Sequence, residues 1–344
     1  MDITNVDGYI IQKVLDCGLC NIGLKVDKGF LGDINDFDIV DNQNQKIDFL
    51  LQKEEKWDYC YFNKPIMALE FDKSTFTNRQ KDNMFYICTN NQQYKIKETS
   101  ILTVKEFSGS FFGKLPYQLF SPKINSNNDY PLVVFLHGSG ERGNDNILQL
   151  IGNKGATVFA DKDFQQLNSC YVVAPQAPLK KVLNHCWIED DMPQYIIKLI
   201  NHLIDRHHID KKRIYLVGMS NGGSGVWKLI YENPLFFAGA IVMCGIVDTN
   251  SLDFKLGQSN LGHLKNVDIN RLRSTPIYIC HDKDDMLIDC YNSLNIYNDL
   301  KDNGKCFLKL TEGYGHSCWK DILNDKCILK WLFEQKRIRI YKEY

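Results

Sequence analysis

The segment around Ser220 contains a residue pattern typical of a serine nucleophile. Gly218-Met219-Ser220-Asn221-Gly222 follows the apolar run 214–217 and precedes the helix-compatible run 226–231. Between a strand and a helix, Gly-x-Ser-x-Gly holds the serine in a sharp, strained turn that exposes its Oγ. The flanking glycines have no β-carbons to collide there. The same letters also fit an ordinary glycine-rich turn, so the chemistry depends on partner residues.

A serine hydroxyl attacks only when a base accepts its proton and a carboxylate holds that base. The catalytic groups of an open parallel sheet gather at the carboxyl ends of its strands. An acidic loop, residues 281–285, follows the predicted strand 277–280. A glycine-rich loop, residues 313–316, follows the predicted strand 306–310 and contains His316. Among the aspartates of the acidic loop we favour Asp285, with Asp284 as its nearest rival. A purely solvated acidic loop is the alternative.

The other histidines fit less well as the base. Only His316, among eight histidines, lies in a glycine-rich loop after a late strand. His207 and His208 are expected at a helix end, where the helix dipole favours them. His281 is expected to shape the acidic loop.

An oxyanion formed during the reaction needs backbone N–H donors. One donor is expected from Asn221, at the start of the helix after Ser220. The second is expected from the loop 137–140, with the Ser139 amide favoured and Gly140 next. Ser139 lacks the strand–turn–helix setting of a nucleophile.

Three further side chains are candidates for the substrate pocket. Trp187 and Trp319 fall in loops near the expected site and could line an acyl or aryl pocket, with ordinary packing as the alternative. Arg142 could hold the oxyanion loop or bind an anionic substrate, and an ion pair with a purely structural role is the alternative.

The chain from residue 106 to residue 344 alternates strands and helices, as a parallel sheet requires. A hairpin is expected over 107–120, and 131–136 reads as a strand buried on both faces. Further strands and helices follow, ending in a closing helix over 322–333. The segment 251–270 is expected to be a small cap or an ordered loop, and 336–344 a terminal strand or a solvated tail.

Residues 1–105 contain short β-type runs separated by polar clusters, without a helical period. This pattern predicts a small β-rich N-terminal domain, sandwich-like in one interpretation. No catalytic constellation is visible in it, so packing, binding or assembly is its expected role.

Composition excludes several classes of protein. The net charge of −1 argues against a nucleic-acid partner, and no apolar run is long enough to span a bilayer. The start of the sequence has neither the basic end nor the apolar core of a signal peptide, so a complete chain would be cytoplasmic. Twelve scattered cysteines predict reduced thiols. Cys17-x-x-Cys20 lacks the partners of a zinc site.

Five segments occur in a characteristic order, at 135–143, 172–176, 218–223, 281–285 and 315–319. Together they resemble the α/β-hydrolase esterases of the predicted peptidase or phospholipase/carboxylesterase-like group. The group includes polyhydroxybutyrate depolymerase-like and feruloyl esterase-like relatives. The resemblance covers about residues 105–335, and it implies an α/β-hydrolase fold with Ser220 as nucleophile, Asp285 as acid and His316 as base. It also implies an oxyanion hole at Ser139 and Asn221. Asp282 departs from the glycine usual in the group, which leaves Asp284 and Asp285 open.

The sequence therefore predicts a serine hydrolase that cleaves a small-molecule or acyl ester through an acyl-enzyme, with no metal and no cofactor. A serine peptidase or an acyl-protein thioesterase on the same fold is the alternative. A catalytically silent hydrolase fold used for binding is the third hypothesis. The acyl chain, the leaving group and the oligomeric state are left open.

Overall fold

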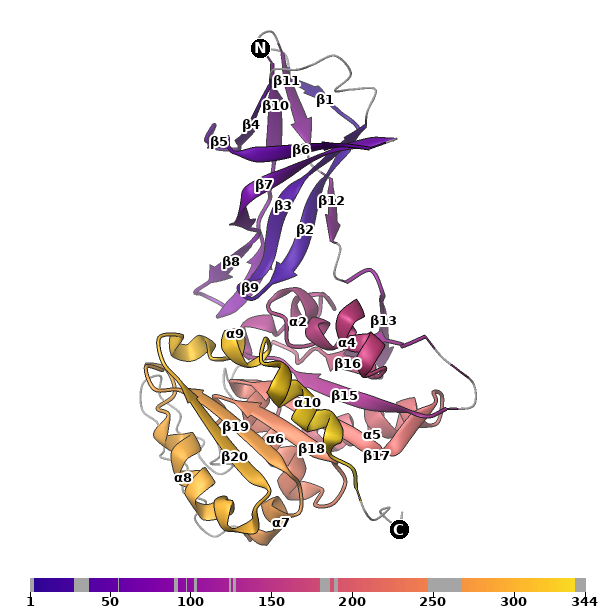
Figure 1. Cartoon of the computed structure of the whole chain (residues 1–344), viewed down its shortest axis with the longest axis vertical. Helices are drawn as coiled ribbons and strands as arrows, with labels where there is room; N and C mark the ends of the chain where they lie inside the picture. The colour runs from indigo at the N-terminus through magenta and orange to yellow at the C-terminus, as the bar shows by residue number, and fades with distance from the viewer. Residues whose placement is uncertain are drawn as a thin grey trace. The chain divides into compact units, whose positions relative to one another are not determined.

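The chain folds into two compact units (Figure 1). The first consists of residues up to Lys105 together with Ile151–Asn153, and the second of Glu106–Leu150 and the residues from Lys154 onward. The computed structural model describes residues 3–27, 37–54, 56–89, 92–96, 98–101, 104–123, 125, 128–179, 186–188, 191–246 and 268–337.

The N-terminal unit is built from short strands. They are β1 (Ile3–Asn5), β2 (Gly8–Leu15), β3 (Gly18–Asp27), β4 (Asp38–Asp41), β5 (Lys46–Ile47), β6 (Phe49–Lys53), β7 (Trp57–Met67), β8 (Leu69–Asp72), β9 (Thr77–Gln80), β10 (Phe85–Cys88), β11 (Gln93–Ile96) and β12 (Thr99–Ile101). Two five-stranded sheets have the orders β1-β11-β10-β4-β5 and β12-β2-β3-β7-β6, and β8 pairs with β9.

Both five-stranded sheets of this unit contribute to one core. In β7 the side chains of Asp58, Cys60 and Phe62 are buried, while the residues between them are partly exposed. This alternation is typical of a strand with one face on a core. The buried cluster joins β2, β3 and β7 of one sheet to β4, β10 and β11 of the other. The unit is thus a β-sandwich, in agreement with the β-rich prediction.

The second unit contains one eight-stranded sheet (Figure 1). Its strands are β13 (Phe107–Phe112), β14 (Leu115–Phe120), β15 (Tyr130–Leu136), β16 (Tyr171–Pro175), β17 (Ile209–Met219), β18 (Gly239–Met243), β19 (Ile277–Asp282) and β20 (Cys306–Thr311). The order is β13-β14-β16-β15-β17-β18-β19-β20. The pairs β13–β14 and β14–β16 are antiparallel, and the pairs from β16 to β20 are parallel. The predicted hairpin over 107–120 is confirmed.

Helices connect these strands. They are η1 (Ser139–Glu141), α2 (Leu148–Ile151), α3 (Thr157–Ala160), α4 (Lys162–Leu167), α5 (Met192–Ile204), α6 (Asn221–Glu232), α7 (Asn270–Arg273), α8 (Tyr291–Leu300), η2 (Lys301–Asn303), η3 (Gly315–Ser317), α9 (Trp319–Ile322) and α10 (Lys326–Glu334), where η marks a 3₁₀ turn. No helix among the described residues is long and apolar enough to cross a membrane.

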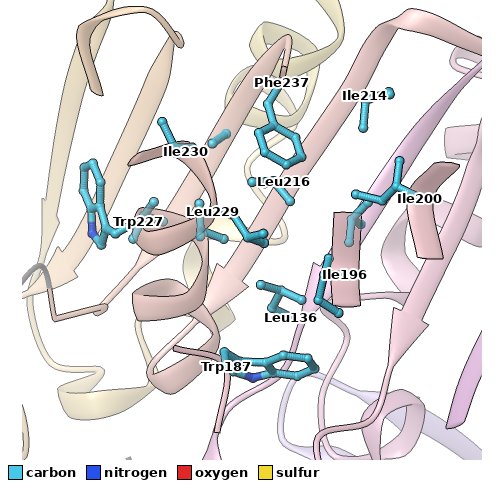
Figure 2. Packing of buried hydrophobic residues seen from close by; sticks show 14 of the residues in the cluster. Leu136, Trp187, Ile196, Ile200, Ile214, Leu216, Trp227, Leu229, Ile230 and Phe237 are labelled. Carbon is cyan, nitrogen blue, oxygen red and sulfur yellow. The ribbon is translucent and has the colours of Figure 1, made fainter. Parts of the chain in front are cut away.

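Helices cover both faces of the sheet. On one face, Leu136 and Leu216 pack with apolar side chains of α5 and α6, such as Ile196 and Leu229 (Figure 2). On the other face, the ring of Tyr215 in β17 lies 5.0 Å from the ring of Phe333 in α10. A strand covered on both faces needs apolar residues at every position, which explains the unbroken apolar run of β15.

The structure corrects two details of the sequence-based prediction. The closing helix over 322–333 is wrong, because α9 ends at Ile322 and a new helix begins after Asp325. The Asp325 side chain accepts hydrogen bonds from the backbone N–H groups of Cys327 and Ile328, which starts α10. The helices α2, α3 and α4 have no counterpart in the sequence prediction, since each is too short to show a helical period. The cap or loop predicted over 251–270 lies outside the described residues up to 267, and the predicted tail does so from 338.

Candidate active site

Ser220 lies in the sharp turn between β17 and α6. Its backbone has φ 52° and ψ −121°, a strained conformation for a residue with a β-carbon. A β-carbon on Gly218 would lie 2.4 Å from the Gly222 carbonyl oxygen, and one on Gly222 would lie 1.9 Å from the carbonyl oxygen of Leu136. The two glycines therefore permit this turn. The Ser220 N–H donates to the Met243 carbonyl of the neighbouring strand, at 2.8 Å.

Ser220, His316 and Asp285 form a hydrogen-bonded chain. The Oγ of Ser220 lies 2.9 Å from Nε2 of His316, and Nδ1 of His316 lies 2.7 Å from Oδ2 of Asp285. A carboxylate can only accept, so the Nδ1–H of His316 donates to it, and this leaves Nε2 to accept the Ser220 hydroxyl proton. The three residues come from the carboxyl ends of β17, β19 and β20 or from the loops that follow them.

The carboxylate of Asp285 is buried and accepts hydrogen bonds at both oxygens. Its Oδ1 accepts from the backbone N–H groups of Leu287 and Ile288 at 2.9 and 3.0 Å. Its Oδ2 accepts from His316 and, at 3.2 Å, from Nε2 of His281. Burial alone would raise the pKa of Asp285, but the hydrogen bonds from both histidines outweigh it and hold this pKa far below its ordinary value. Asp285 is therefore ionised at neutral pH.

The structure brings Asp285, and not Asp284, to His316. The Asp284 carboxylate instead accepts the backbone N–H of Gly313 at 2.8 Å, in the loop that leads to His316. The two adjacent carboxylates thus have different partners. Asp285 contacts the His316 imidazole, and Asp284 contacts the backbone of the loop that carries His316.

His281 fixes the far side of the Asp285 carboxylate. Its Nε2 lies within hydrogen-bond distance of both Asp285 and the Ile288 carbonyl, so that nitrogen carries the proton. Its Nδ1 then accepts the hydroxyl proton of Ser293 at 2.7 Å. The imidazole is fully buried. This geometry fits the expectation that His281 shapes the acidic loop, and it makes His281 a positioning residue for Asp285.

Asp282, which the sequence analysis singled out only as a departure from the usual glycine, organises the loop that carries His316. Its carboxylate is fully buried. It accepts four hydrogen bonds, from Thr311 Oγ1 at 2.8 Å, Asp284 N at 2.9 Å, Tyr314 N at 3.1 Å and Gly315 N at 3.1 Å. Burial would raise the pKa of Asp282, but these four donors outweigh it and lower the pKa. The charged carboxylate therefore ties β20 and the turn before His316 to the end of β19.

Replacing this carboxylate by an amide, Asp282→Asn, is expected to destabilise the protein by about 2–3 kcal/mol at neutral pH, since an N–H₂ group then faces N–H donors. A depressed carboxyl pKa contributes stability that is present above the ordinary value and lost as the pH falls through the folded-state value. The difference between wild type and variant should therefore be full above about pH 5 and shrink below about pH 4. Urea unfolding at several pH values measures it. A difference that stays constant down to pH 3 would contradict this role.

The loop expected to supply the second oxyanion donor lies beside Ser220. A β-carbon on Gly138 would lie 3.5 Å from the β-carbon of Ser220, so the backbone passes close to the hydroxyl. Ser139 begins η1 directly after this glycine, and Asn221 is the first residue of α6. The Asn221 side-chain amide donates to Ser139 Oγ at 3.4 Å. The two predicted oxyanion residues are thus neighbours, and their roles stay predictions.

Buried side chains support this loop. The Arg142 Nε–H donates to the Ser139 carbonyl at 2.8 Å, and Arg142 is buried. The Trp187 Nε1–H donates to the His137 carbonyl at 2.9 Å, and the indole packs in the core that also contains Leu136 (Figure 2). Burial lowers the pKa of His137 to about 4, so its neutral ring accepts the Ala177 N–H at Nε2. These contacts favour the loop-holding role for Arg142 and the packing alternative for Trp187, and a pocket role for either stays untested.

Trp319 is the remaining pocket candidate. It begins α9 and is partly buried, and its ring meets the His316 ring edge-on at a centroid separation of 5.7 Å. The contact places an apolar surface beside the imidazole, and its role toward a substrate stays a prediction.

Comparisons of sequence and structure show which known proteins this chain resembles. The family model described as phospholipase/carboxylesterase matches residues 185–327. Lysophospholipase-like protein 1 of Mus musculus is 28% identical over 142 residues, which is 36% of this chain and 57% of the mouse protein. The match therefore spans little more than half of that relative's length.

Solved structures extend the comparison to the whole chain. A structure described as a thermostable esterase has a TM-score of 0.80 and 25% identity, over 96% of this chain and 99% of that one. A putative dipeptidyl aminopeptidase IV from Bacteroides ovatus has a TM-score of 0.52 at 12% identity, over 75% of this chain and 41% of that one, which is a likeness of fold alone. With the strand order of the sheet, these similarities show that the chain has an α/β-hydrolase fold and is an enzyme that resembles the carboxylesterases.

Proposed function

We propose that this protein is a serine hydrolase that cleaves carboxylic esters through an acyl-enzyme intermediate. The observation that carries the proposal is the continuous hydrogen-bonded chain from Ser220 Oγ through His316 to Asp285. A nucleophile, its base and the group that orients the base then stand in the order that acyl transfer requires. The phospholipase/carboxylesterase match and the thermostable esterase favour an ester over a peptide bond.

In the proposed first step, Ser220 Oγ attacks the ester carbonyl while His316 Nε2 takes its proton. The ester C–O bond then breaks, and His316 returns that proton to the departing alkoxide, which leaves as the alcohol. In the second step, water attacks the acyl-enzyme, His316 accepts the water proton and passes it to Ser220 Oγ, and the acid is released. Asp285 remains ionised and stabilises the imidazolium in both steps.

We propose that the developing oxyanion is held by the backbone N–H groups of Asn221 and Ser139. The Asn221 amide lies at the first turn of α6, where the helix dipole also favours negative charge. The Ser139 amide follows Gly138, whose missing side chain lets the loop approach Ser220. We further propose that residues 106–344 form the catalytic domain and residues 1–105 a separate domain.

A panel of substrates tests the reaction class. The purified chain should hydrolyse p-nitrophenyl acetate and butyrate, with much slower turnover of matched p-nitroanilide peptides and acyl thioesters. Faster turnover of the peptides or thioesters would replace the ester assignment by the alternative on the same fold. A folded protein that turns over none of them would contradict the hydrolase proposal.

A further inference from the structure

Three side chains with metal-binding atoms converge at the candidate active site. Within the part of the chain that the structure describes, Cys244, Asp285 and His316 each offer one ligand atom, and these atoms lie within 4.8 Å of one another. Two of the three belong to the proposed catalytic chain. Cys244 has no part in the proposed hydrolysis, so its position needs a separate account.

Cys244 lies beside His316 and Asp285, and its own backbone is strained. It follows β18 directly, has φ 44° and is fully buried. Its Sγ lies 3.8 Å from the His316 carbonyl oxygen. Burial, and after it the neighbouring thiol of Cys318, raises the pKa of Cys244 well above its ordinary value. The sulfur atom thus lies beside the imidazole and the carboxylate.

One sulfur, one nitrogen and one oxygen ligand suit a borderline-soft cation. Zn²⁺ binds cysteine, histidine and carboxylate, and sites with three protein ligands leave the fourth position open. Mg²⁺ and Ca²⁺ prefer oxygen ligands alone. We propose that Cys244, Asp285 and His316 form an inhibitory site for a thiophilic divalent cation, represented by Zn²⁺.

The change needed to bind the cation is small. The His316 Nδ1 and Asp285 Oδ2 atoms are 2.7 Å apart. Two ligands at tetrahedral angles on zinc, with bonds of about 2.0 Å, are roughly 3.3 Å apart. The pair must therefore open by a few tenths of an ångström while the sulfur moves inward. The other Asp285 oxygen keeps its hydrogen bonds from the Leu287 and Ile288 backbone.

Binding at Nδ1 would stop the proposed hydrolysis through the tautomer of His316. The cation takes the Nδ1 lone pair, so the imidazole proton moves to Nε2, and Nε2 then has no lone pair for the Ser220 proton. The Cys244 thiol loses its proton to solvent and binds as thiolate. One proton is released per cation bound, no oxidation occurs, and the site is blocked without any contact with substrate.

The inhibition test measures ester hydrolysis against free Zn²⁺ concentration. Wild type should lose activity and recover it when EDTA removes the metal. Removing one of three ligands, in Cys244→Ala, should raise the half-inhibitory concentration at least about tenfold. Cys306→Ala removes another buried thiol, in β20, and should leave that concentration unchanged. Equal inhibition of wild type and Cys244→Ala would overturn the proposal.

A second measurement does not depend on hydrolysis. Cd²⁺ bound to thiolate gives a charge-transfer absorption, so titration of Ser220→Ala with Cd²⁺ reports binding in a variant whose proposed nucleophile is absent. In the double variant Ser220→Ala/Cys244→Ala, the absorbance at saturation should be lower by about the contribution of one Cd²⁺–thiolate bond. The binding step of highest affinity should also be absent. Identical titrations of the two proteins would overturn the metal site and leave the proposed function untouched. If the two titrations differ as expected but the wild-type protein hydrolyses no ester, the metal site is supported and the proposed function is overturned.

Discussion

Replacing Ser220 by alanine is expected to lower kcat for p-nitrophenyl butyrate by roughly 10⁴- to 10⁶-fold. The proposed nucleophile is then missing, and only binding and oxyanion stabilisation remain to favour attack by water. The fold should be retained, because Ser220 donates its backbone N–H to Met243 and alanine keeps that bond. Steady-state kinetics and a thermal unfolding scan measure the two effects.

Ser139→Ala is the matched control for this variant. Ser139 is the serine of the proposed oxyanion loop, and its side chain accepts a long hydrogen bond of 3.4 Å from the Asn221 side chain. Alanine keeps the Ser139 amide that we propose as an oxyanion donor, so kcat should fall by no more than about tenfold. A loss in Ser139→Ala as large as that in Ser220→Ala would point to the wrong serine.

Asp285→Asn is expected to reduce kcat by about 10⁴-fold near neutral pH. An amide at this position can donate to His316 Nδ1, which favours the tautomer with a proton on Nε2 and removes the acceptor for the Ser220 proton. The loss should appear in kcat with a smaller change in KM, because the change acts on proton transfer and not on substrate contacts.

The adjacent carboxylate supplies the comparison. Asp284→Asn keeps an oxygen that can accept the Gly313 N–H, and no hydrogen bond to His316 is changed. Its kcat should stay within about threefold of wild type. If the Asp284 variant were the more impaired of the two, the assignment of the acid would have to be exchanged.

Much of the fold could be predicted from the sequence, because strand-length apolar runs alternate with helical segments in the second unit. Ser220, Asp285 and His316 each come just after a predicted strand, which is enough to predict one shared edge, since carboxyl ends of parallel strands meet there. The break between α9 and α10 cannot be predicted from the apolar period, which continues across it; α9 ends at Ile322 and Asp325 caps the start of α10.

The directions in which side chains point cannot be predicted from the sequence. Asp284 and Asp285 differ by one position, and only the turn in which Oδ1 of Asp285 accepts two backbone N–H groups aims its other oxygen at His316. The four donors around Asp282 come from residues 284–315, so no local pattern reveals them. Trp187 falls in a loop by sequence, yet its ring lies in the core.

Covalent labelling tests the central claim most directly. A fluorophosphonate reacts with a serine only where a base activates it and the leaving fluoride is displaced. Treated wild-type protein should gain the mass of one phosphonyl group, located by peptide mass spectrometry on Ser220, and Ser220→Ala should stay unmodified. Labelling on another residue, or equal labelling of wild type and Ser220→Ala, would contradict the account.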